Sequence, residues 1–197
     1  MMKRTILLSV LSCLLSLTAL AQKEERETDI NKKRAPQPAV EWMNDAFEGA
    51  RKIQWYREET TENKGGQVKL SFEAKLNWKG QFYSVEFDEN GEIEDIEIIY
   101  EWDEMPQEVR DTLDGYFRSN YTKHRIQKIQ VQYTGSSDDL EDAIDEDEFE
   151  DITVRYEIEY YGSNDEGKRL WEGIFDDKGQ PMEKSEVTQR PTDNLTY

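Results

Sequence analysis

The chain has 197 residues, a formal net charge of −19 at neutral pH and 11% aromatic residues. This length allows one domain or two small ones, and the aromatic content is sufficient for a hydrophobic core despite the charge. Such a negative chain repels nucleic acid phosphates and anionic lipids, which excludes both as partners. It leaves cationic partners, divalent ions or a role of the charge in solubility alone.

The first 21 residues have the order of a secretory signal peptide. Lys3-Arg4 precede an apolar run from Ile6 to Leu20, and small residues end at Ala21 before a charged stretch. The apolar run is too short to span a bilayer. We therefore predict cleavage after Ala21 and a periplasmic or secreted protein without a transmembrane segment. Cys13, the single cysteine, leaves with this segment, so no disulfide is expected.

Residues 22–38 are charged, lack apolar periodicity and end in a proline-rich stretch, which predicts a flexible leader. A folded domain is expected from 39 to 188, followed by a loose tail at 189–197. Its first element is a helix that ends near Arg51, because apolar residues recur there at helical spacing: Val40, Met43, Phe47 and Ala50.

Beyond this helix the apolar period changes to two. The clearest strand runs from Val68 to Trp78, with apolar residues on one face and polar residues on the other, so one face should be buried and the other wet. Lys79-Gly80 then turns the chain into a second strand, and a further strand follows from Ile93 to Tyr100.

The order of elements in this part of the chain is repeated. Residues 82–91 and 170–179 each join an alternating apolar strand to an acidic turn closed by glycine, and Pro106 opens a second amphipathic helix. We therefore predict repeats at about 39–102 and 103–188. The fold class is α+β, with two tandem α-β-β-β-β repeats forming one antiparallel sheet that carries both helices on one face and leaves the other open.

These residues resemble a known family. The strand Tyr83-Ser84-Val85-Glu86-Phe87, its turn Asp88-Glu89-Asn90-Gly91 and the helix start Met105-Pro106-Gln107-Glu108-Val109 are similar to those of the PepSY-like family of secreted bacterial proteins. That family is described as similar in fold to the β-lactamase inhibitor protein. The resemblance covers about Ala39 to Val187 and implies a non-enzymatic exported module that binds or inhibits a partner. It supplies no catalytic residues.

Two candidate sites follow from the pattern. Four apolar side chains have the opposite parity to the core positions of their strands and mark a binding surface on the open face: Phe82, Tyr161, Leu170 and Ile174. The acidic segment 138–151, expected as a solvated loop, offers oxygens to Ca²⁺ but has no glycine to converge them. Its candidate ligands are Asp138, Asp139, Glu141, Asp142, Asp145 and Asp147.

The favoured function is a binding or inhibitory module that engages a protein or peptide, including a basic one, through the open sheet face. A Ca²⁺-responsive acidic envelope protein is the alternative. The sequence contains no catalytic set and implies no cofactor, so an enzyme is not expected. Acid–base work by Glu86 and Glu172 would require these carboxylates to face each other across a cleft.

Overall fold

The computed structural model describes residues 22–62, 68–146 and 148–187. The predicted signal peptide and tail lie outside these ranges. The first part of the chain forms β1 (Gln22–Ile30), α1 (Gln37–Ala46), β2 (Gln54–Glu62), β3 (Val68–Trp78), β4 (Gln81–Asp88) and β5 (Ile93–Ile99). The second forms α2 (Gln107–Asn120), β6 (Lys123–Thr134), α3 (Ser137–Asp145), β7 (Thr153–Asn164), β8 (Gly167–Asp176) and β9 (Pro181–Val187).

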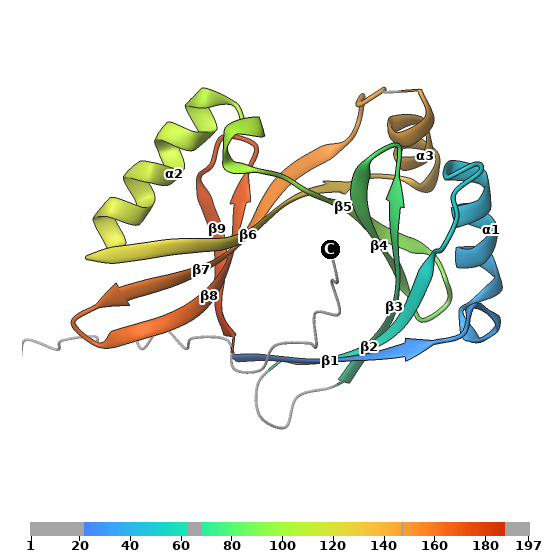
Figure 1. Ribbon diagram of the computed structural model, residues 1–197, viewed down its shortest axis with the longest axis horizontal. Helices are drawn as coiled ribbons and strands as arrows, with labels where there is room; N and C mark the ends of the chain where they lie inside the picture. The colour runs from blue at the N-terminus through green and yellow to red at the C-terminus, as the bar shows by residue number, and fades with distance from the viewer. Residues whose placement is uncertain (1–21, 63–67, 147, 188–197) are drawn as a thin grey trace, which may run out of the picture.

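The predicted α+β repeat architecture is confirmed. A helix followed by four strands occurs twice, as α1 with β2–β5 and as α2 with β6–β9. Consecutive strands pair antiparallel from β1 to β9, and β1 also meets β9 in a short parallel pairing of Gln22 with Glu186 and Lys23 with Val187. Figure 1 shows the sheet curving strongly, with α1 and α2 on its outer side.

Two stretches differ from the sequence-based prediction. Residues 22–30, expected within a flexible leader, form β1, because their backbone pairs with β2 over eight positions and this pairing does not need an apolar pattern. The acidic segment, expected as a loop, contains α3. This helix is stabilised by a reciprocal cap between Ser136 and Asp139 and buries Leu140 and Ile144.

One continuous core lies between the outer face of the sheet and the helices. Phe47, at the end of α1, packs edge-on against Trp78 and Tyr83 at 5.3 and 5.2 Å between ring centroids. In the second repeat Phe117 of α2 packs against Tyr160 at 4.8 Å. The helices α1 and α2 therefore each cover the sheet of their own repeat.

The two acidic turns are also equivalent in structure. Asp88 Oδ1 accepts from the backbone N–H groups of residues 90 and 92, and Asp176 Oδ1 accepts from those of residues 178 and 180. Gly91 and Gly179 close these turns at φ +88° and +76°. A side chain on Gly91 would meet the start of α1, and one on Gly179 would come within 2.9 Å of the Val109 carbonyl oxygen of α2. Both turns thus press against the first turns of their own helices.

The face of the sheet opposite the helices, here called the inner face, is more buried than the sequence suggests. On β3, Ser71 and Glu73 are only 4% and 5% exposed, although their strand was expected to have one wet face. The strong curvature of the sheet turns this polar face inward. None of the helices in the described ranges is both long and apolar enough to cross a membrane.

Candidate binding face and its carboxylate clusters

The inner face carries rows of side chains that lie directly opposite one another on neighbouring strands. In one row Glu73 of β3, Glu86 of β4 and Asp95 of β5 are consecutive cross-strand partners. A second row places Glu159 of β7 opposite Glu172 of β8. Like charges directly opposite in a sheet lower folding stability, so these rows are a costly arrangement.

Glu86, Asp95 and Glu97 form a tight group, here called the β4–β5 carboxylate trio. One carboxylate oxygen from each residue lies within 4.8 Å of the others. Asp95 and Glu97 are buried and Glu86 is half-buried. The trio arises because a β-bulge after Glu86 brings Asp95 opposite it, while Glu97 follows two residues later on the same face.

Electrostatics in the trio favour the protonated carboxyls. Burial, followed by the charges of Asp95 and Glu97, raises the pKa of Glu86 well above its ordinary range. Burial, followed by the charges of Glu157 and Asp95, also raises the pKa of Glu97, and the nearby ammonium of Lys128 lowers it without cancelling the shift. Ionising the trio is therefore opposed both by burial and by the repulsion among its own carboxylates.

A second carboxylate trio shows how such a group can be stabilised. Glu27, Glu58 and Glu73 also approach one another within 4.8 Å. Here Lys75 Nζ lies 2.8 Å from Glu73 Oε2 and 3.1 Å from Glu27 Oε1. Burial alone would lower the pKa of Lys75. The charges and hydrogen bonds of Glu73 and Glu27 together raise it by more than burial lowers it, so the ammonium stays charged. The chain supplies this trio with its own cation.

Neutral amides stand beside the β4–β5 trio. Gln130 Nε2 donates to Glu97 Oε2, and Gln132 Nε2 donates to Asp95 Oδ2 at 3.2 Å. Gln130 is 5% exposed, and its carbonyl oxygen Oε1 has no hydrogen-bond partner within the part of the chain that the structure describes. A buried amide oxygen without a donor is costly, and here it belongs to an amide that touches the carboxylates.

The predicted apolar residues are partly brought together. Tyr161 and Leu170 are direct cross-strand partners on β7 and β8, and Ile174 lies on the same face of β8 two rows away. All three are half-buried. We call them the β7–β8 apolar group. Phe82 is on β4, opposite Asn77, and is not part of this group.

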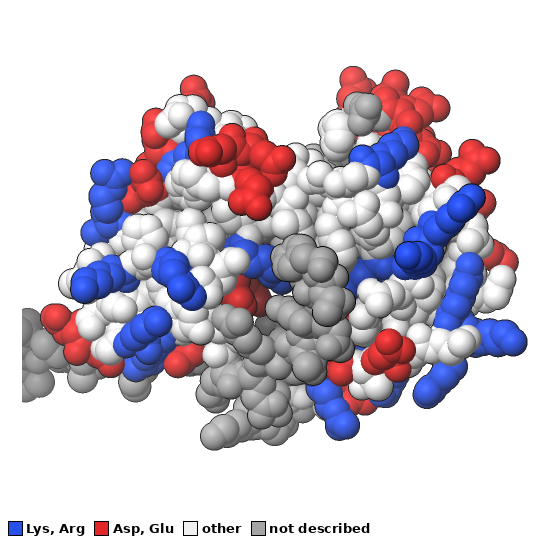
Figure 2. Space-filling view, viewed as in Figure 1, with Lys and Arg blue, Asp and Glu red and all other residues white. Residues whose placement is uncertain are grey.

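The predicted metal ligands of the acidic segment lie on or beside α3. Asp139 caps this helix because its Oδ2 accepts from the Ser136 backbone N–H at 3.3 Å, while Asp142 and Asp145 are exposed. Asp147 lies outside the described residues. Within the described ranges, neither of the two close carboxylate groups includes an acid of this segment. Figure 2 shows acidic side chains gathered over the end of the molecule where α3 lies.

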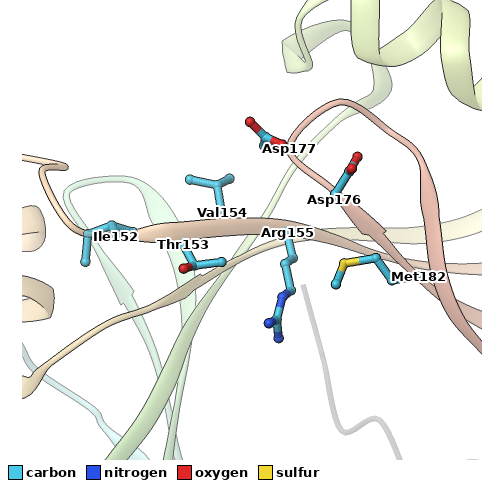
Figure 3. A pocket seen from close by; sticks show the side chains of 7 residues that line it. All are labelled: Ile152, Thr153, Val154, Arg155, Asp176, Asp177 and Met182. Carbon is cyan, nitrogen blue, oxygen red and sulfur yellow. The ribbon is translucent and has the colours of Figure 1, made fainter.

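A pocket of about 300 Å³ lies where β7, β8 and β9 meet. Its lining comprises Ile152, Thr153, Val154, Arg155, Asp176, Asp177 and Met182 (Figure 3). Arg155 points away from the two aspartates in this view, and Asp176 is already used by its turn. The lining therefore brings no acid and base together for catalysis.

Sequence reasoning did not find the β4–β5 trio. Its members occupy polar positions of ordinary amphipathic strands, and their convergence depends on the pairing of β4 with β5 and on the bulge in that pairing. The signal that was available is the two-residue turn at Lys79-Gly80, which fixes Glu73 opposite Glu86.

The fold occurs in solved structures from Bacteroides. A DUF2874 family protein from Bacteroides ovatus matches with a TM-score of 0.53 and 12% identity, over 82% of this chain and 93% of that one. A Bacteroides eggerthii protein, described provisionally as periplasmic, matches with a TM-score of 0.52 and 16% identity, over 78% and 90%. A BLIP-like protein from Bacteroides fragilis gives a TM-score of 0.48 and 15% identity, over 80% and 90%.

At these identities the likeness shows a shared fold alone. No family model matches the chain, and none of the curated proteins compared with it is similar. Membership in the PepSY-like family therefore stays a prediction, and the chain is similar in fold to the Bacteroides ovatus and Bacteroides eggerthii proteins.

Proposed function

We propose that the chain is an exported, non-enzymatic module that binds a basic and partly apolar segment of a protein or peptide on the inner face of its sheet. The observation that carries the proposal is the row Glu73–Glu86–Asp95, in which carboxylates lie directly opposite one another. Ammonium or guanidinium groups of a ligand would relieve this repulsion, so the charges favour a cationic occupant.

The β7–β8 apolar group gives such a ligand a second kind of contact. On these strands Tyr161 and Leu170 are followed by Glu159 and Glu172 and then by Glu157 and Ile174, all on the inner face. Apolar and acidic side chains therefore alternate along the surface. An extended segment with alternating basic and apolar residues is complementary to it.

Export is supported by the signal-peptide pattern of residues 1–21 and by the provisional periplasmic description of the Bacteroides eggerthii protein with the same fold. A binding role without catalysis is supported by the pocket lining, which assembles no acid–base pair. The module acts as an inhibitor where the bound segment belongs to an enzyme.

The test uses two fluorescently labelled peptides, one alternating Lys with Leu and the other Glu with Leu, titrated with the protein and followed by anisotropy. We expect the Lys peptide to bind, the Glu peptide not to bind, and the affinity to fall as salt rises. The double variant Leu170→Ser/Ile174→Ser should weaken binding. Val68→Ser is the matched control, because Val68 is 56% exposed and outside the β7–β8 apolar group.

Equal binding of both peptides, or an unchanged affinity in the double variant, would contradict the proposal. The first result would show that charge does not select the ligand, and the second that the ligand does not contact the β7–β8 apolar group.

A further inference from the structure

The two carboxylate trios of the inner face differ in the groups that contact their carboxylates. In the trio of Glu27, Glu58 and Glu73, the ammonium of Lys75 lies between two of the carboxylates. In the β4–β5 trio, the carboxamides of Gln130 and Gln132 contact the carboxylates instead. An amide is neutral, so these contacts add no positive charge to the trio, and the ammonium of Lys128 offsets only part of the repulsion that Glu97 meets.

We propose that the β4–β5 carboxylate trio, together with Gln130 Oε1, is a binding site for a divalent cation and that Ca²⁺ is the ion that fits it. This inference does not rest on peptide binding by the inner face. The ligands would be Glu86, Asp95, Glu97 and the Gln130 carbonyl, and all of them are hard oxygen donors of the kind that Ca²⁺ prefers.

The spacing of the trio suits Ca²⁺. Ca²⁺ binds oxygens at about 2.4 Å, so two ligands on opposite sides of the ion are about 4.8 Å apart. The three carboxylate oxygens already lie within 4.8 Å of one another. Mg²⁺ demands near-octahedral geometry and gives up its bound water reluctantly, so a set of several protein oxygens favours Ca²⁺ over Mg²⁺.

Gln130 is the observation that points to a ligand independently of the acids. Its side chain is buried at 5% exposure, its amide contacts Glu97, and its Oε1 finds no donor among the described residues. A metal ion held by Glu97 would satisfy this oxygen. The acids of α3 offer no comparable arrangement, because they lie along an exposed face of a short helix.

The test is calorimetric titration of the purified, chelator-treated protein with CaCl₂ and, separately, with MgCl₂. We expect one Ca²⁺ site with a Kd of about 10⁻⁴–10⁻³ M, as in extracellular modules, and weaker binding of Mg²⁺. The double variant Asp95→Asn/Glu97→Gln should bind Ca²⁺ at least about tenfold more weakly. Removing residues that only hydrogen-bond to metal ligands already costs about tenfold, so removing the ligands themselves should cost no less. Gln130→Leu, which changes no charge, should also weaken binding.

Two further variants make the result specific. Glu58→Gln alters the trio that contacts Lys75 and removes no proposed ligand. It should change the Ca²⁺ affinity far less than Asp95→Asn/Glu97→Gln does, because Glu58 acts on Glu86 only through its charge. Asp142→Asn/Asp145→Asn alters α3 and should also leave it unchanged. The circular dichroism spectrum of each variant shows that it is folded.

The proposal is overturned if the wild type gives no heat above dilution at about 10 mM Ca²⁺, well above the range of extracellular sites. It is equally overturned if Asp95→Asn/Glu97→Gln binds as the wild type does, or if the α3 variant is the one that loses binding. That last result would assign the ion to the acidic segment 138–151.

Discussion

Glu86→Gln should make the protein more stable at neutral pH, because Glu86 lies directly opposite Glu73 on one side and Asp95 on the other. Each pair of like charges directly opposite in a sheet costs about 0.2–1 kcal/mol. Glutamine keeps the shape of the side chain and removes both repulsions, so the free energy of unfolding should rise by about 1 kcal/mol. In a domain of this size that corresponds to an increase in Tm of about 2–4 °C.

The gain should depend on pH in a defined direction. Burial, and then the charges of Asp95 and Glu97, raises the pKa of Glu86, so the folded protein binds this proton more tightly than the unfolded chain does. The free energy of unfolding of the wild type therefore falls as the pH rises from about 4.3, the ordinary pKa of glutamate, through the raised value. Glu86→Gln removes this fall, so its advantage should be small at pH 4 and should grow as the pH rises to 8.

Thermal unfolding followed by circular dichroism between pH 4 and 8, with a chelator present, measures both effects. Glu89→Gln is the control, because Glu89 is exposed in the turn after β4 and should leave Tm unchanged. A lower Tm for Glu86→Gln at pH 8, or the same gain at pH 4 as at pH 8, would refute the reasoning about the β4–β5 trio.

Three further substitutions test the packing. Gly179→Ala should lower the free energy of unfolding by about 2–4 kcal/mol, because a side chain there is strained at positive φ and meets the backbone of α2. Gly49→Ala, at a similar φ of +77° but with no atom nearby, should lower it by only about 1 kcal/mol. Equal losses in urea unfolding would show that the contact with α2 contributes nothing. Phe117→Ala, at a fully buried site, should cost about 3–5 kcal/mol in the same assay, and a loss below 1 kcal/mol would argue against its place in the core. Lys75→Met should cost about 3–5 kcal/mol, and adding Glu73→Gln should recover part of it; no recovery would mean that Lys75 acts by packing alone.

The repeat and the helices were predictable because each rests on a local pattern. The strand from Val68 to Trp78 has the predicted bounds, and α2 begins directly after Pro106, as expected. β1 was not predictable. Its residues 22–30 carry no apolar alternation, and their strand conformation is imposed by pairing with β2, which is a contact between distant parts of the chain.

The candidate site shows the same division. The two-residue turn at Lys79-Gly80 fixes the pairing of Glu73 with Glu86, so half of the acidic row could be derived from the sequence. A regular continuation would place Glu94 opposite Glu86, but the bulge shifts the register by one residue and brings Asp95 there. Bulges depend on how strands pack in three dimensions, and no local residue pattern announces this one.

The helix α3 has a consequence for how the molecule unfolds. It is inserted in the second repeat, yet it packs against α1 and β5 of the first, and Trp42 Nε1 of α1 donates to the Ser137 carbonyl oxygen at its start, at 3.4 Å. The helix α3, which has no counterpart in the first repeat, therefore connects the two repeats. Because α3 connects them, the two repeats should unfold in one cooperative transition, rather than as two independent units of different stability.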